Sequence, residues 1–130
     1  MRLAIAEARR GTGRTAPNPT VGAVIVRAGR VIGRGWHRKA GQPHAEIEAL
    51  KSLKSPALAR GSTIYITLEP CSTQGRTPPC TTAILAAGIS HVVYGATDPN
   101  PRHAGRADRI LHKAGVRVTT GILAKECTEL

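Results

Sequence analysis

The chain has 130 residues, of which 41% are hydrophobic and 21% charged, so its composition is that of a folded globular domain and not of a disordered segment. Nineteen basic residues against eight acidic ones give a net charge of +11, while aromatic residues make up only 2%. A chain of this length is expected to fold as a single domain over residues 1–130. No apolar run approaches the ~20 residues of a membrane span, so a membrane-embedded chain is not expected.

The basic charge is concentrated in the first half of the chain. Residues 1–60 carry twelve basic and three acidic side chains, whereas residues 61–130 carry seven and five. Three interpretations stay open: binding of a polyanion, binding of a small anionic substrate, or a solvated basic face. Proteins that bind single-stranded nucleic acid or RNA loops usually stack bases on aromatic side chains. With only Trp36, Tyr65 and Tyr94 available, the sequence disfavours RNA as the partner.

Hydrophobic periodicity predicts helices and strands that alternate along most of the chain. The N-terminal segment is typical of an amphipathic helix and is too short and too charged for a secretory signal. In chain order we expect helix 2–10, strands 21–26 and 30–36, helix 44–54, strand 62–68, helix 80–87, strand 89–94, helix 106–114, strand 116–120 and a final helical turn. Gly33 and Gly35, in the second strand, are interpreted as close-packing positions.

This order of elements predicts an α/β fold. A hairpin at 21–36 is followed by β-α-β units, whose parallel strands are joined by right-handed crossovers. The expected architecture is a three-layer α/β/α sandwich in which helices cover both faces of a five-stranded mixed sheet.

The cysteines indicate a metal site. There are three, Cys71, Cys80 and Cys127, and an odd number argues against a disulfide framework. Metal ligation with Cys127 as a spare thiol fits this count better, and it agrees with a cytoplasmic location.

Three short segments place candidate ligands directly after proline: PHAE at 43–46, PC at 70–71 and PPC at 78–80. Proline is favoured in the first helical turn, so His44 and Cys80 are expected at helix N-termini, where backbone N–H groups favour a thiolate. One histidine and two cysteines suit tetrahedral Zn²⁺ with a fourth position open for water, as in catalytic sites. A purely structural zinc, for which only the distant Cys127 offers a fourth protein ligand, is the alternative.

Glu46 follows His44 by two residues, a spacing that puts side chains on nearly opposite sides of a regular helix. At the helix entry His44 can leave the regular path, so both side chains could face one site. Glu46 would then carry a proton from water to a leaving nitrogen. The pattern H-x-E followed by P-C is typical of zinc deaminases, although here eight residues and not two separate the cysteines.

The long cysteine spacing points to a narrower group. Over essentially its whole length, the chain resembles the deaminase domain of the bifunctional riboflavin-biosynthesis enzymes, diaminohydroxyphosphoribosylaminopyrimidine deaminase. The matching segments are PNPTVGAVIV at 17–26, GRGWH at 33–37, GQPHAE at 41–46, LEPCSTQGRTPPC at 68–80, AAGI at 86–89 and DPNP at 98–101. The resemblance implies a cytidine-deaminase-like fold. It also implies hydrolytic deamination of 2,5-diamino-6-(5-phosphoribosylamino)pyrimidin-4-one to 5-amino-6-(5-phosphoribosylamino)uracil and ammonia.

The resemblance also assigns roles to individual residues. The implied ligands of one zinc ion per chain are His44, Cys71 and Cys80, and Glu46 matches the proton shuttle. The implied substrate-contacting residues are Asn18, His37, Arg76, Asp98 and Asn100. Arg76 would suit the phosphate, because a guanidinium pairs well with phosphate oxygens.

Two departures from the family pattern keep alternatives open. Thr73 stands where the family commonly has a histidine, which changes one polar contact near the substrate but not the metal site. The family continues into an NADPH-dependent reductase domain, which implies a reductase partner, and it is usually oligomeric, which implies a homo-oligomer. The alternatives are a nucleic-acid or nucleoside deaminase with the same metal chemistry, which the basic charge favours, and a non-catalytic module.

Overall fold

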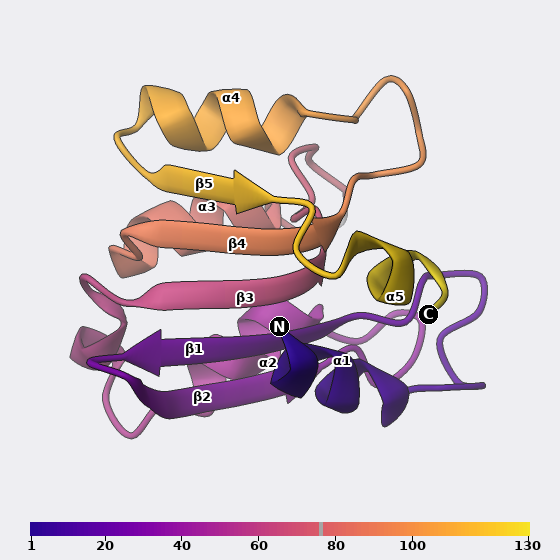
Figure 1. Cartoon of the computed structure of the whole chain (residues 1–130), viewed down its shortest axis with the longest axis horizontal. Helices are drawn as coiled ribbons and strands as arrows, with labels where there is room; N and C mark the ends of the chain where they lie inside the picture. The colour runs from indigo at the N-terminus through magenta and orange to yellow at the C-terminus, as the bar shows by residue number, and fades with distance from the viewer. Residues whose placement is uncertain (76) are drawn as a thin grey trace.

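The computed structural model describes residues 1–75 and 77–130, and these residues form one sheet between two layers of helices (Figure 1). The strands are β1 (Gly22–Arg27), β2 (Arg30–Trp36), β3 (Thr63–Leu68), β4 (His91–Ala96) and β5 (Arg117–Thr120). The helices are α1 (Arg2–Arg9), α2 (Ala45–Lys51), α3 (Cys80–Ala87), α4 (Arg106–Lys113) and α5 (Ala124–Thr128), with a 3-10 turn, η1 (Pro56–Ala59). Within the described residues, no helix is both long enough and apolar enough to cross a membrane.

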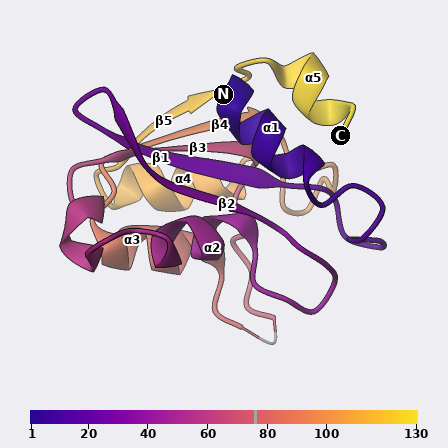
Figure 2. The ribbon, with the colours of Figure 1, turned by 90° about the horizontal axis from the view of Figure 1, so that it is seen from below.

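The sheet is mixed, as predicted. Its described strands run in the order β2-β1-β3-β4-β5. β1 is antiparallel to both of its neighbours, while β3, β4 and β5 are parallel. Seen from below, α2, α3 and α4 cover one face, and α1 and α5 lie on the other (Figure 2). The three-layer α/β/α sandwich is therefore confirmed.

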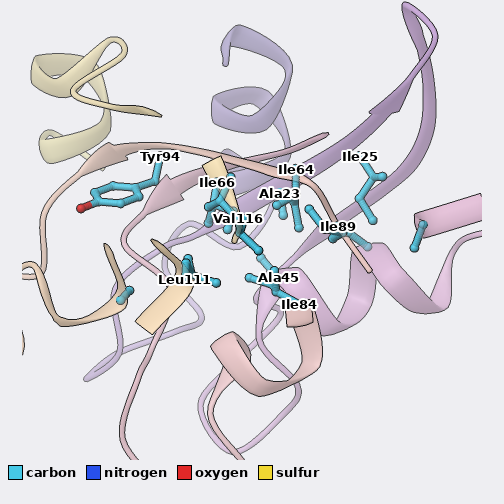
Figure 3. Close-up of a cluster of buried hydrophobic side chains, with 14 of the residues drawn as sticks. Ala23, Ile25, Ala45, Ile64, Ile66, Ile84, Ile89, Tyr94, Leu111 and Val116 are labelled. Carbon is cyan, nitrogen blue, oxygen red and sulfur yellow. The ribbon is translucent and has the colours of Figure 1, made fainter. Parts of the chain in front are cut away.

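The main core lies between the sheet and the layer of α2, α3 and α4. Apolar side chains that point to this face from β1, β3 and β4 meet residues of α2, α3 and α4 (Figure 3). Tyr94 is buried in this cluster, and its hydroxyl donates a 2.6 Å hydrogen bond to Asp108 of α4. A smaller cluster joins α1 to α5 around Ile5 and Cys127. The two clusters fix the sheet from both sides.

The helix expected over residues 44–54 is shorter in the structure. α2 ends at Lys51, where the Ser52 hydroxyl donates a 2.7 Å hydrogen bond to the Ala49 carbonyl and accepts one from the Arg34 N–H of β2. The Ala49 carbonyl, which also accepts the Ser52 N–H, thus gains a second donor at the helix end, and the edge-strand N–H of Arg34 gains an acceptor. The 3-10 turn that follows was not predicted, because its proline and alanines show no amphipathic period.

The fourth strand is shifted by two residues from the range expected at 89–94. The N–H of Ser90 donates to the Ser62 carbonyl and so only leads into the ladder, whereas Ala96 still pairs with Leu68. Gly95 and Ala96 lack the bulky side chains typical of strands, which is why the pattern misplaced the end. A Cβ at Gly95 would collide with Cys127 of α5, so the glycine lets this helix rest on the strand.

Gly33 and Gly35 confirm the interpretation as close-packing positions. A Cβ built on Gly35 would lie 2.6 Å from the Ala45 carbonyl oxygen, and one on Gly33 would lie 2.8 Å from the Ala49 carbonyl oxygen. α2 therefore packs directly on the backbone of β2. This contact sets the position of the N-terminus of α2, on which His44 and Glu46 lie.

Replacing Gly35 with alanine is expected to lower the free energy of unfolding by about 1–3 kcal/mol, because the helix must move away from the strand. Urea unfolding would measure the change. Gly75→Ala is the matched control, since no described atom lies within 4 Å of the new Cβ, and its effect should stay within about 0.5 kcal/mol. Equal losses in the two variants would contradict the packing explanation.

Candidate functional site

His44, Cys71 and Cys80 come together at the ends of two helices and one strand. His44 is the N-cap residue of α2, with extended backbone angles of φ −70° and ψ 163°. Cys80 is the first residue of α3, after Pro79, and Cys71 lies in the segment that follows β3. The predicted placement of His44 and Cys80 at helix N-termini is confirmed.

The Cys71 side chain is bound to the start of α3. Its Sγ accepts the backbone N–H of Cys80 at 3.0 Å, and its carbonyl accepts the N–H of Thr81 at 3.2 Å. The first N–H groups of a helix have no partner within the helix, so Cys71 satisfies two of them. These bonds bring Cys71 and Cys80, which are nine positions apart in the sequence, next to each other. Arg76, in the segment between them, lies outside the described residues.

The three candidate ligand atoms lie within 4.8 Å of one another. His44 Nδ1 is 3.3 Å from Cys80 Sγ and 3.7 Å from Cys71 Sγ. In a tetrahedral zinc site, usual Zn–N and Zn–S lengths separate a nitrogen from a sulfur by about 3.5 Å. The donor set and its spacing therefore fit Zn²⁺ bound by His44, Cys71 and Cys80.

The local electrostatics of this corner suit a cation. Hydrogen bonding with the Cys80 thiol, and with His44, lowers the pKa of Cys71 to about 4. The same contact with Cys71, together with burial, raises the pKa of Cys80. Hydrogen bonding to Cys71 also raises the pKa of His44. A thiolate and a second buried thiol next to an imidazole form a soft, electron-rich donor set.

Glu46 faces the same pocket as His44. Only 3% of Glu46 is exposed, and burial raises the pKa of its carboxyl group. Because His44 has extended and not helical backbone angles, the two side chains reach one pocket of about 210 Å³ despite their i, i+2 spacing. The predicted departure of His44 from the helical path is confirmed.

The pocket brings together most of the residues predicted from the sequence. The predicted residues in its wall are Asn18, His37, His44, Glu46, Cys71 and Asp98. Asn100 stands apart from these described lining residues: it is exposed, and its side-chain oxygen accepts the Arg102 N–H at 3.0 Å. The prediction for Arg76 falls outside the described residues.

Hydrogen bonds fix the orientation of His37, which is 3% exposed. Its Nδ1 lies 3.1 Å from the Pro43 carbonyl oxygen, which only accepts, so Nδ1 carries the hydrogen. Nε2 is then the acceptor for the Asn18 side-chain nitrogen at 3.2 Å. The His37 ring also meets the His44 ring edge to face, with centroids 5.4 Å apart. His37 thus links Asn18 to the corner that holds the candidate ligands.

One buried residue of the pocket was missed by the sequence analysis. Glu69 lines the pocket and is 5% exposed, yet it received no role. It lies within the segment LEPC, directly before Pro70 and Cys71. The sequence did hold a signal for this residue: a carboxylate stands at the end of a predicted strand, with no basic residue nearby in the sequence to pair with it.

The comparisons with known proteins agree with this site. Residues 1–96 match the family model described as the cytidine and deoxycytidylate deaminase zinc-binding region. The chain is 48% identical over 130 residues to the riboflavin biosynthesis protein RibD of Aquifex aeolicus and spans 36% of that protein's length. It is 46% identical over 126 residues to the diaminohydroxyphosphoribosylamino-pyrimidine deaminase of Buchnera aphidicola from Schizaphis graminum, covering 97% of this chain and 84% of that protein.

The fold agrees as well. A Thermotoga maritima structure named diaminohydroxyphosphoribosylaminopyrimidine deaminase/5-amino-6-(5-phosphoribosylamino)uracil reductase superposes with a TM-score of 0.91 at 43% identity. The match covers 99% of this chain and 37% of that one. The chain therefore spans little more than a third of these longer relatives. It belongs to the zinc-binding cytidine and deoxycytidylate deaminase family and, within it, to the diaminohydroxyphosphoribosylaminopyrimidine deaminases of riboflavin biosynthesis.

Proposed function

We propose that this chain deaminates 2,5-diamino-6-(5-phosphoribosylamino)pyrimidin-4-one by hydrolysis. The observation that carries the proposal is the convergence of His44, Cys71 and Cys80, of which His44 and Cys71 line one pocket together with the buried carboxyl group of Glu46. The reaction consumes one water molecule and releases one ammonia molecule. The water oxygen bonds to the ring carbon that carries the 2-amino group, the bond from that carbon to the amino nitrogen breaks, and the product is the uracil.

In this proposal the three ligands hold one Zn²⁺ ion per chain. Bound zinc would supply a Lewis acid that lowers the pKa of water, so that the nucleophile is available at neutral pH. Glu46 takes a proton from the attacking water and delivers it to the departing amino nitrogen. Its burial keeps competing water away from the carboxylate, so the proton passes between the two reacting groups.

The remaining predicted residues would bind the rest of the substrate. His37 accepts one N–H of the Asn18 side-chain amide, so the amide oxygen and the second N–H are left for polar groups of the pyrimidine. The Asp98 carboxylate suits a ribose hydroxyl and would repel a phosphate. Arg76 would bind the phosphate, and Asn100 would contact the ribosyl phosphate end, where it also shapes the loop.

The proposal includes the predicted partners. The reductase named in the Thermotoga maritima structure supports a reductase partner for this chain, and we retain the prediction of a homo-oligomer. The free thiols of Cys71, Cys80 and Cys127 support a cytoplasmic location.

A substrate panel tests the proposed function. Protein carrying one zinc per chain should release ammonia from the diaminopyrimidinone ribotide and lose about 10- to 100-fold in kcat/KM on the compound without its phosphate. Cytidine and an RNA stem-loop should give no product above background. Turnover of the RNA with strongly salt-dependent binding would favour the alternative of a nucleic-acid deaminase. Absence of turnover on every compound would favour a non-catalytic module.

A further inference from the structure

The loop between β4 and α4 is tied to the pocket by a single buried side chain, that of Glu69. Its Oε1 accepts the backbone N–H groups of Asp98 and Gly105, each at 3.1 Å. Its Oε2 accepts the N–H of Ala107, the second residue of α4, at 3.1 Å. Both ends of the loop that spans residues 98–105 thus meet at one carboxylate, which sits 29–38 positions earlier in the sequence.

The backbone of Glu69 is itself held in place. Its N–H donates to the Ala96 carbonyl at 2.8 Å, which continues the pairing of β3 with β4 beyond the last ladder pair. Pro70 and Cys71 follow directly, so Glu69 stands in the chain between β3 and a candidate zinc ligand. A buried carboxylate is stabilised by N–H donors and by the positive end of a helix, and α4 supplies both.

The loop presents Asp98 to the pocket in a defined way. Asp98 Oδ1 accepts the Asn100 N–H at 2.9 Å, which closes a turn within the loop. Its Oδ2 lies 3.7 Å from His103 Nδ1, and the residue lines the pocket. Each carboxylate oxygen keeps acceptor capacity for a substrate donor, and the position of both depends on the backbone that Glu69 holds.

We propose that Glu69 is a positioning residue: by holding the N–H groups of Asp98, Gly105 and Ala107, it places the Asp98 carboxylate for substrate binding. We assign Glu69 no contact with the reacting atoms, because the described hydrogen bonds of both its oxygens go to the loop and to α4. The effect of Glu69 on substrate binding rests on the proposed function, whereas its effect on the loop does not depend on that function.

Two variants separate this role from general destabilisation. Glu69→Ala removes the acceptor for all three N–H groups. Glu69→Gln keeps one carbonyl oxygen, which can still accept from Asp98 and Gly105, but it turns an N–H₂ group toward the Ala107 N–H. Glu7→Gln is the matched control: Glu7 is equally buried, at 5% exposure, and lies in α1, where it pairs with Arg10 and Arg34.

Hydrogen exchange measures the effect on the loop in the intact protein. In Glu69→Ala, the amides of Asp98, Gly105 and Ala107 should exchange at least about tenfold faster. In Glu69→Gln, the increase should be largest at Ala107. Glu7→Gln should leave these amides at the rates of the unsubstituted protein. Unchanged exchange at these amides in Glu69→Ala would overturn the proposal.

Steady-state kinetics measure the effect on substrate. Glu69→Ala should raise KM for the ribotide about tenfold or more, while kcat per bound zinc changes less than about threefold, because the reacting groups stay in place. Glu69→Gln should lie between the alanine variant and the unsubstituted protein. A KM unchanged in Glu69→Ala, or raised equally by Glu7→Gln, would overturn the role in binding. If the unsubstituted protein releases no ammonia, the proposed function fails, and the exchange rates alone decide whether Glu69 holds the loop.

Discussion

Replacing Glu46 with glutamine is expected to lower kcat by about 10²- to 10⁴-fold, which is the usual contribution of a positioned acid–base group. Glutamine has nearly the same shape but cannot take up the proton of water at neutral pH. The three candidate zinc ligands are untouched, so zinc content should remain at one ion per chain. Ammonia release and metal analysis on the same preparation would measure both quantities.

Glu48→Gln is the matched control for this result. Glu48 lies on the same helix, two residues further on, and its carboxylate pairs with Arg38 at 3.7 Å. It lies outside the described wall of the pocket, so its replacement should leave kcat within about twofold. If Glu46→Gln kept more than about a tenth of the original kcat, Glu46 would not be the proton carrier.

Replacing Cys80 with serine is expected to weaken zinc binding by at least about 100-fold and to abolish activity. Loss of a group that only orients a metal ligand costs 10- to 100-fold in affinity, and loss of a ligand should cost more. A serine hydroxyl stays protonated at neutral pH, whereas zinc selects a thiolate. Competition with a chromogenic chelator would measure the affinity.

Cys127→Ala separates loss of a ligand from loss of a buried thiol. Cys127 is 6% exposed and packs in the cluster that joins α1 to α5, on the sheet face opposite α2 and α3. This variant should keep one zinc per chain and its activity. Zinc loss in Cys127→Ala, or full retention in Cys80→Ser, would contradict the assignment of the ligands and the interpretation of Cys127 as a spare thiol.

Most of the fold was predictable because the residues that end helices and strands are clear in the sequence. Gly88, in a left-handed conformation with φ 80°, ends α3 at the predicted residue. The predicted range of β2, residues 30–36, is also confirmed. The errors fall where tertiary contacts replace local signals. Ser52 lies at the end of α2 and bonds to the N–H of Arg34 in β2, and Ala96 extends β4 by pairing with Leu68 of β3.

The positions of His44, Glu46 and Cys80 were predictable because proline-led segments put them at helix starts. The hydrogen bonds that hold other pocket residues were not predictable where they join distant segments. Asn18 meets His37 across 19 positions, and Glu69 meets Ala107 across 38. No periodicity or spacing reports such pairs, because they depend on how the loops close over the ends of the strands.

The structure also explains part of the basic excess in residues 1–60. The guanidinium groups of Arg10 and Arg38 lie 4.0 and 4.3 Å from the centre of the Trp36 ring. Glu7 pairs with Arg10 and also with Arg34, at 3.7 Å in each case. These contacts agree with a structural role for part of the charge.

The most direct test of the central claim is ammonia release from the diaminopyrimidinone ribotide by protein that carries one zinc ion per chain. The account predicts ammonia and the aminouracil ribotide in equal amounts, loss of activity when a chelator removes the metal, and recovery when zinc is added back. The contradicting result would be no ammonia from the zinc-loaded protein under conditions in which a known deaminase of this family converts the same substrate.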